Sequence, residues 1–141
     1  MYNIYHDFII KATKAEIFEA ISNPKDLNNW WTKKCSGKPE LNAEYNLFFS
    51  EKDNWFGKVS ICDLNSSFHI KMTKTDEDWR PTSFGFDLEE AKSGTLVKFS
   101  HTNWKECNPH FKHTSFCWAI LLNGLKQYVE KGIILPFENR G

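Results

Sequence analysis

The sequence predicts an α+β fold in which a curved antiparallel sheet wraps around a long C-terminal helix, with two short helices after the first strand. Residues 39–104 contain short runs of alternating apolar and polar side chains separated by turn signals, which is typical of an antiparallel meander. Residues 114–131 carry the strongest helical periodicity in the chain. Helix start signals follow the first strand, so the predicted order is one strand, two short helices, five strands and one long helix.

The N-terminal segment predicts the first strand and the two short helices. Residues 2–11 place alternate apolar side chains on one face, as a half-buried strand does. Thr13 and Glu16 have the spacing of a capping box, in which each side chain bonds to the backbone of the other residue. Asn23 and Pro24 then predict a second helix start, with Asn as the N-cap and Pro at the first helical position.

The middle and the end of the chain predict the sheet and the helix that it covers. Five strand-like runs occupy residues 41–50, 55–64, 67–73, 83–88 and 95–103. Ser93-Gly94 is a turn signal between the last two runs. The long helix has a broad apolar stripe and is expected to end at Gly132. Because only the sheet is large enough to cover this stripe, we expect an elongated space between sheet and helix, closed at one end by the short helices.

Length and charge limit the classes of protein to be considered. With 141 residues, one domain spanning residues 1–141 is expected. The 18 basic and 18 acidic residues balance, which argues against nucleic acid or an anionic membrane as a partner. No apolar stretch approaches the ~20 residues of a membrane span, so no membrane insertion is expected. The first fourteen residues do not resemble a signal peptide, and the four cysteines form no C-x-x-C pair, which favours reduced thiols in the cytoplasm.

The aromatic content is unusual. Aromatic residues make up 16% of the chain, including 12 Phe and 6 Trp. Large rings bury much area each but leave gaps when they crowd together. The composition is therefore compatible with a heavy aromatic core or with a cavity lined by rings.

Several short motifs occur in the order and spacing of a known family. They are Ile17-Phe18 through Ala20-Ile21, Asn23-Pro24, Trp30-Trp31, Pro39-Glu40-Leu41 through Tyr45-Asn46-Leu47, Phe56-Gly57-Lys58-Val59, and Trp118 through Leu122, Leu125, Tyr128 and Gly132. On these residues the chain resembles the SRPBCC (START/Bet v 1-like) superfamily. Within it, the chain is similar to the activator of Hsp90 ATPase homologue C-terminal-type domain. The resemblance covers nearly the whole chain and implies a helix-grip fold. At Asn42-Ala43 such proteins usually carry glycine, but Asn tolerates the left-handed conformation that the turn needs.

The resemblance implies a fold more than a single activity. Members of the superfamily include lipid carriers, hormone receptors, polyketide cyclases and co-chaperone domains. The eukaryotic Hsp90 activator also has a separate N-terminal domain, for which this chain has no room. We therefore do not expect Hsp90 activation to transfer to it.

The strand face of Val97, Phe99, His101 and Asn103 is the first candidate site. An apolar wall with one or two polar groups is how a pocket orients a small molecule. His101 would donate, accept or shuttle a proton there. The alternative is a histidine whose nitrogens are satisfied by backbone or water near the end of the strand.

Two sulfurs and two imidazoles lie within residues 107–117 and suggest a zinc site. Cys107, His110, His113 and Cys117 are the ligand types that tetrahedral zinc prefers. Structural zinc sites usually draw paired ligands from separate segments, and Pro109 restricts the path of the loop. The alternative is a scatter of unconnected residues before a helix, so we expect no metal and no cofactor.

The loop of residues 76–80 combines three acidic residues with Trp79 and Arg80. It would form a lid over the cavity mouth, with Arg80 binding a carboxylate. The alternative is a solvated hairpin loop in which Trp79 covers the edge of the sheet.

The leading hypothesis is that the chain binds a small hydrophobic or amphipathic ligand between the sheet and the C-terminal helix. The expected lining is Trp31, Phe49, Phe86, Phe99, Trp118 and Leu122, with His101 as the polar anchor. One alternative is a protein-interaction module without a ligand. Another is a cyclase- or hydrolase-like enzyme that uses His101 in the same cavity. The sequence contains no nucleophile elbow, phosphate-binding glycine loop or recognisable pair of catalytic carboxylates.

Overall fold

The structure, a computed structural model that describes residues 1–141, contains one antiparallel sheet and three α-helices. The strands are β1 (Tyr2–Ile10), β2 (Lys34–Ser36), β3 (Glu44–Phe48), β4 (Asn54–Asp63), β5 (Ser67–Lys74), β6 (Ser83–Ala91) and β7 (Gly94–Trp104). The helices are α1 (Lys14–Ser22), α2 (Pro24–Trp30), α3 (Pro109–Lys131) and the 3-10 helix η1 (Phe137–Asn139). The sheet order is β1-β7-β6-β5-β4-β3-β2, so β1 and β2 are its edges.

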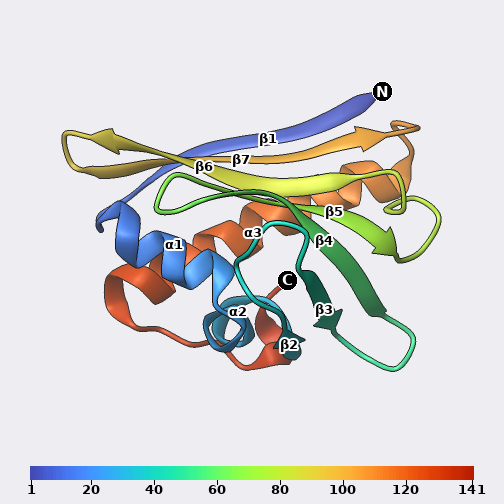
Figure 1. Cartoon of the computed structure of the whole chain (residues 1–141), viewed down its shortest axis with the longest axis horizontal. Coiled ribbons are helices and arrows are strands. Elements are labelled where there is room, and N and C mark those ends of the chain that lie inside the picture. The colour runs from blue at the N-terminus through green and yellow to red at the C-terminus, as the bar shows by residue number, and fades with distance from the viewer.

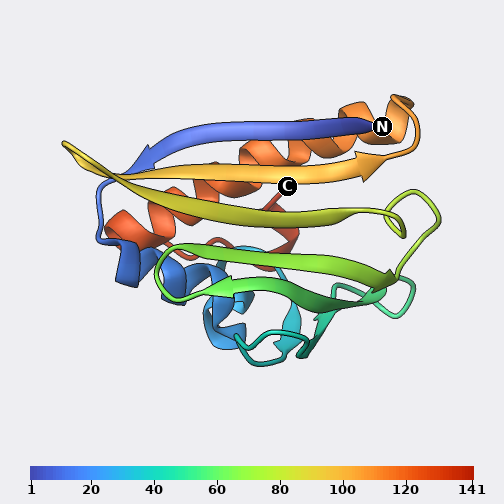
Figure 2. The ribbon, with the colours of Figure 1, turned by 45° about the horizontal axis from the view of Figure 1, so that its top comes forward.

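The sheet curves over α3, which lies along its concave face (Figure 1). Figure 2 shows β1, β7 and β6 arching across the helix, with α1 and α2 beneath the other strands. After α3 the chain turns back and passes beside α2, as the red segment in Figure 1 shows. This arrangement confirms the predicted helix-grip fold.

The predicted helix boundaries with local capping signals are confirmed. The Thr13 side chain accepts a hydrogen bond from the Glu16 amide, and the Glu16 side chain accepts one from the Thr13 amide. The Asn23 side chain accepts from the Lys25 amide at the start of α2. At the end of α3, Gly132 adopts the left-handed conformation with φ 67°. These caps require contacts within a few residues only, which is why the sequence predicts them.

Several elements differ from the sequence prediction: β3 is shorter than residues 41–50, β6 extends past residue 88 to Ala91, and α3 and β2 differ as follows. Helix α3 begins at Pro109 rather than near Thr114, because Asn108 caps it by accepting from the Phe111 amide at 2.9 Å. A proline is tolerated in this first turn, since its missing N–H would be unpaired there in any case. The short edge strand β2 was not predicted, because three residues are too few to show a period.

The core lies between the concave face of the sheet and the three helices. It contains 25 buried apolar side chains in one cluster. Along β7 the buried positions alternate through Thr95, Val97, Phe99 and His101, as the period of two predicts. The expected inward position of Asn103 is wrong: its φ of 71° breaks the alternation, so Asn103 is exposed and Trp104 is buried instead. Asn42 has φ 68°, the left-handed conformation that was expected of it at this turn.

No helix of the structure is both long enough and apolar enough to cross a membrane.

Candidate functional site

An open pocket of about 420 Å³ lies at the N-terminal half of α3, and we call it the aromatic pocket. The end of α2, the β3–β4 connection, the β5–β6 loop and α3 all contribute to it, together with the last residue of the chain. Its lining residues are Trp31, Phe49, Asp53, Trp55, Asp76, Trp79, His110, Thr114, Cys117, Trp118, Leu121 and Gly141.

Five of the lining side chains form a closed circuit of touching rings. The centroid distances are 5.4 Å from Trp31 to Phe49 and 5.4 Å from Phe49 to Trp55. Trp55 lies 4.7 Å from Trp79, which lies 6.2 Å from Trp118. Trp118 closes the circuit at 5.0 Å from Trp31. These separations fall in the range in which aromatic pairs attract one another, so the wall of the pocket is held by its own contacts.

Trp79 is fixed in this wall by the loop that carries it. Its amide donates to Oδ1 of Asp76 at 3.0 Å, and its carbonyl accepts from the Thr82 hydroxyl at 2.6 Å. The ring is only 5% exposed, yet Nε1 is buried and has no hydrogen-bond partner. A buried N–H without an acceptor is uncommon in folded proteins and costs stability. Nε1 of Trp104 is also buried and unpaired, so the aromatic cluster contains two such donors. Only Trp79 lines the pocket, and its Nε1 is closed to solvent.

The charged groups of the aromatic pocket are acidic. Asp53 and Asp76 are exposed at its rim, and no lysine or arginine lines it. His110 is the remaining ionisable side chain besides Cys117, and its Nδ1 lies 2.8 Å from Oδ2 of Asp78. Burial raises the pKa of Cys117, so this thiol is protonated near neutral pH.

Behind the rings, His101 forms the centre of a hydrogen-bond chain. Nε1 of Trp118 donates to Nδ1 of His101 at 3.0 Å, because an indole N–H can only donate. Nδ1 therefore accepts, and Nε2 of His101 carries the proton that it donates to the Thr82 hydroxyl at 2.9 Å. Thr82 in turn donates to the carbonyl of Trp79. Both nitrogens of His101 are thus occupied, and the chain connects two rings of the pocket wall.

The environment of His101 keeps its ring uncharged. Burial, with a smaller contribution from the nearby His110, lowers the pKa of His101 from 6.5 to about 3. The side chain is 0% exposed and packs 4.4 Å from the ring of Trp79. Both nitrogens are satisfied, as the alternative expected, but by the side chains of Trp118 and Thr82 and not by backbone or water, so no nitrogen is free for proton transfer.

The residues named from the sequence fall into two groups. Trp31, Phe49 and Trp118 line the aromatic pocket. Phe86, Phe99 and His101 lie in the core beneath it, while Leu122 borders a separate recess of about 200 Å³ between α3 and β1. Phe99 still supports the wall, because its ring lies 4.5 Å from that of Trp118.

Neither Trp55 nor Trp79 was predicted from the sequence as a lining residue, although a lid over the cavity mouth was one interpretation of the loop that carries Trp79. A signal existed for Trp55, since it and Phe49 flank the turn of the β3–β4 hairpin, where Leu47 pairs with Trp55. The loop of residues 76–80 contributes Asp76 and Trp79 to the pocket wall, whereas Arg80 is exposed outside it. A large apolar ring in a polar loop is expected to pack against other side chains, but the sequence does not identify those side chains.

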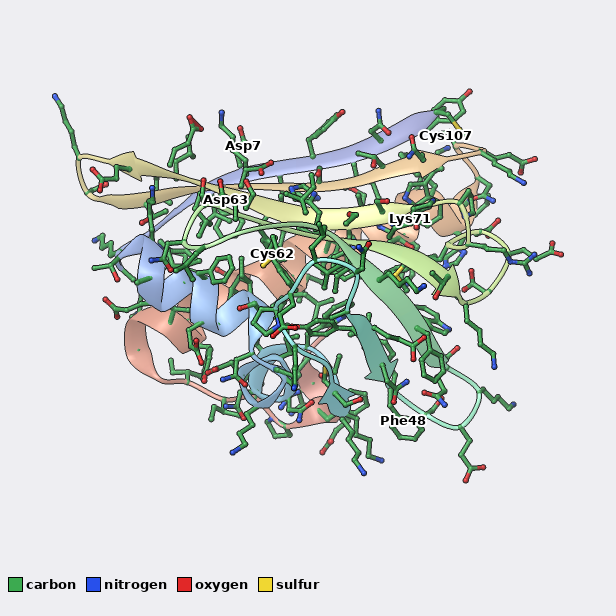
Figure 3. The ribbon with its side chains drawn as sticks, in the orientation of Figure 1. Asp7, Phe48, Cys62, Asp63, Lys71 and Cys107 are labelled. Atoms are coloured by element: carbon green, nitrogen blue, oxygen red, sulfur yellow. The ribbon has the colours of Figure 1, made fainter.

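The four candidate zinc ligands do not converge. His113 contacts Cys117 at 3.3 Å, one turn along α3, but His110 pairs with Asp78 and Cys107 is exposed. No three side chains of the ligand types are close enough to hold one ion. Figure 3 shows Cys107 at the start of α3, far from Cys62.

Comparison with known proteins identifies close matches in fold. The sequence model of the family described as Activator of Hsp90 ATPase homolog 1-like protein matches residues 11–130. The Aha1 dimer from Colwellia psychrerythraea is 30% identical, with a TM-score of 0.85 over 94% of this chain and 98% of that one. A protein from Staphylococcus saprophyticus is 18% identical, with a TM-score of 0.80 over 95% and 96% of the two chains. CalU16 from Micromonospora echinospora is 17% identical, with a TM-score of 0.71 over 92% and 76%. No curated protein matches the sequence.

Proposed function

Because the chain belongs to the family of Activator of Hsp90 ATPase homolog 1-like proteins, we propose that it binds a small apolar or amphipathic molecule in the aromatic pocket. The single observation that supports this function is the open pocket bordered by five rings. Its volume of about 420 Å³ lies in the range of small-molecule sites. The superfamily commonly uses the same space between sheet and helix for apolar ligands.

Trp79 takes the role of the polar anchor in this proposal. Its buried Nε1 has no protein partner but is closed to solvent, so a ligand oxygen would bond to it only after the ring has turned towards the pocket. His101 has no such capacity, because both of its nitrogens are already bonded. His101 instead positions the rings of Trp118 and Trp79.

The test is a binding titration with a neutral fluorescent naphthylamine, followed by quenching of tryptophan emission and by calorimetry. The Trp55→Leu variant removes one ring of the wall and should weaken binding about tenfold. The matched control is Tyr5→Leu, since Tyr5 is an exposed ring on β1 outside the pocket. Equal affinity in Trp55→Leu and wild type would contradict the proposal.

The anchor is tested separately with Trp79→Phe, which keeps a ring and removes the indole N–H. Ligands with an ether or carbonyl oxygen should lose affinity several-fold, while pure hydrocarbons should not. An equal loss for both ligand types would assign Trp79 a packing role only.

A second candidate function is association with another copy of this chain. The relative from Colwellia psychrerythraea is a dimer. In this chain Phe116 and Ile120 of α3 are 65% and 42% exposed, and Ile133 and Leu135 lie beside Ile120 around a small recess. Exposed apolar side chains grouped in this way favour an interface. Analytical ultracentrifugation of wild type and of Phe116→Ser with Ile120→Ser decides it, because a dimer should become a monomer in the variant. A wild-type monomer at high concentration would exclude it.

A further inference from the structure

The wall of the aromatic pocket has the chemistry of a cation site, and we propose that its ligand carries an alkylated ammonium group next to its apolar part. This inference rests on the proposed function, because it specifies the ligand class of the same pocket. It follows from the ring types in the wall, the charges at the rim and the scarcity of acceptors inside.

The rings supply the first part of the argument. Four of the five are indoles, the side chain whose face attracts cations most strongly. Trp31, Trp79 and Trp118 are at most 6% exposed. The half-buried rings of Phe49 and Trp55 are therefore the ones that a cation can reach. Because their centroids lie 5.4 Å apart, one ammonium group at the mouth can lie within about 6 Å of both.

The rim charges supply the second part. Asp53 and Asp76 give the mouth a negative potential, and the lining contains no basic side chain except His110. His110 is paired with Asp78. A carboxylate ligand such as a fatty acid would meet two like charges and no counter-ion there. The formal net charge of the chain is +0, so attraction of a cation to this mouth is a local property and not a consequence of overall charge.

The scarcity of acceptors distinguishes an alkylated ammonium from a primary one. A primary ammonium has three N–H donors and is strongly hydrated, so it needs several acceptors when it leaves water. The wall consists mostly of rings, Oδ1 of Asp76 already accepts from the Trp79 amide, and both rim carboxylates are exposed to water. Methyl groups on the nitrogen remove the need for acceptors and bury apolar surface against the rings.

Three compounds of nearly the same shape test the charge directly. They are phenyltrimethylammonium, its neutral isostere tert-butylbenzene, and the anion benzenesulfonate. We expect the cation to bind about tenfold more tightly than the isostere, and the anion to bind most weakly. The cation's advantage should shrink as salt is raised, because part of it comes from exposed carboxylates.

The outcomes separate this inference from the proposed function. Equal binding of phenyltrimethylammonium and tert-butylbenzene would overturn the cation preference and leave the apolar pocket supported. Preferred binding of benzenesulfonate would also overturn it. If none of the three compounds binds while the naphthylamine does, the cation preference fails and the proposed function stands; if the naphthylamine does not bind either, both proposals fail.

Variants assign the preference to this pocket. Asp53→Asn combined with Asp76→Asn removes both rim charges, and the amide oxygen at position 76 can still accept from the Trp79 amide. The double variant should lose several-fold affinity for the cation and keep its affinity for tert-butylbenzene. The control is Asp63→Asn, which removes an exposed charge at the other end of β4 (Figure 3). Equal loss of both ligands in the double variant, or the same loss in the control, would contradict the assignment.

Discussion

The two ends of the space between α3 and the sheet are built from different side chains. Towards the C-terminal half of α3, covered by α1, most of the space is filled by aliphatic residues that are at most 3% exposed: Ile10, Ile17, Ile21, Leu88, Val97 and Leu125. We call this the aliphatic end. The buried rings of Phe18 and Phe68 pack beside these six residues, under α1. Towards the N-terminal half of α3, rings dominate and the aromatic pocket opens to solvent. Branched aliphatic chains adapt to one another and fill space, whereas large flat rings in contact leave openings between them.

The comparison assigns the two ends different roles. The aliphatic end contributes burial, and none of its six residues lines the aromatic pocket. The aromatic end gives up some close packing and leaves Nε1 of Trp79 unpaired. Stability is therefore expected to depend most on the aliphatic end, and binding most on the aromatic one.

The largest expected effect is on unfolding free energy at the aliphatic end. Leu125→Ala should destabilise the protein by about 3 kcal/mol, because Leu125 is fully buried and its removal leaves a cavity. The matched control is Leu121→Ala, one turn earlier on α3, where Leu121 is half-buried and lines the pocket. It should cost about 1 kcal/mol. Urea unfolding measures the loss of unfolding free energy in both variants. Equal losses would show that the two ends contribute equally to stability.

A second effect concerns the pH dependence of stability at the aromatic end. The folded-state pKa of His101 is lowered from 6.5 to about 3, so the unfolded chain binds this proton more readily. The contribution of His101 to the free energy of unfolding is fully present above pH 6.5 and is lost as the pH falls towards 3. By pH 4 the loss should reach roughly 3 kcal/mol.

The variant that isolates this contribution is His101→Gln. A glutamine can accept from Trp118 and donate to Thr82 without taking up a proton. Urea unfolding at several pH values between 7 and 4 should give a shallower decline for His101→Gln than for wild type. Parallel declines would show that the ring of His101 is not the group responsible.

The smallest effect concerns α3, the element that both ends share. Gly124 lies in the middle of the helix, and a Cβ added there meets nothing within 4 Å. Gly124→Ala should therefore stabilise the protein by about 0.5–1 kcal/mol, since alanine loses less backbone entropy. Thermal unfolding measures this gain, and ligand affinity should not change.

The control for the α3 prediction is Gly132→Ala at the end of the helix. Gly132 has φ 67°, so a side chain there should cost about 1 kcal/mol. If both variants were more stable than wild type, helix propensity alone would account for the stability of α3.

Much of the fold was predictable, because its signals are local. The caps at Thr13, Asn23 and Gly132 involve contacts within four or five residues. The buried positions of β7 from Thr95 to His101 follow a period of two, which is visible in the sequence. The exceptions are also local in origin: β2 is too short to show a period, and the cap at Asn108 was not recognised.

The site was only partly predictable. Trp31, Phe49 and Trp118 were expected to line a cavity and do line the pocket, but Phe86 and Phe99 share the same apolar pattern and lie in the core. The sequence pattern does not separate the residues that line the pocket from those in the core. Periodicity shows which side of a helix or strand a residue lies on, but not how deeply that residue is buried.

By itself the sequence determined the order of the elements, the antiparallel sheet around α3 and the concentration of rings on the inward faces. Only the tertiary structure decided which rings meet, since the five in the circuit come from α2, the β3–β4 hairpin, the β5–β6 loop and α3. It also decided that His101 is occupied and Trp79 is not, because each depends on partners far away along the chain. The physical reason is the separation of the interacting residues along the chain. Helix caps and the spacing of apolar residues depend on neighbours in the sequence, whereas a pocket is the space that remains after distant segments have packed together.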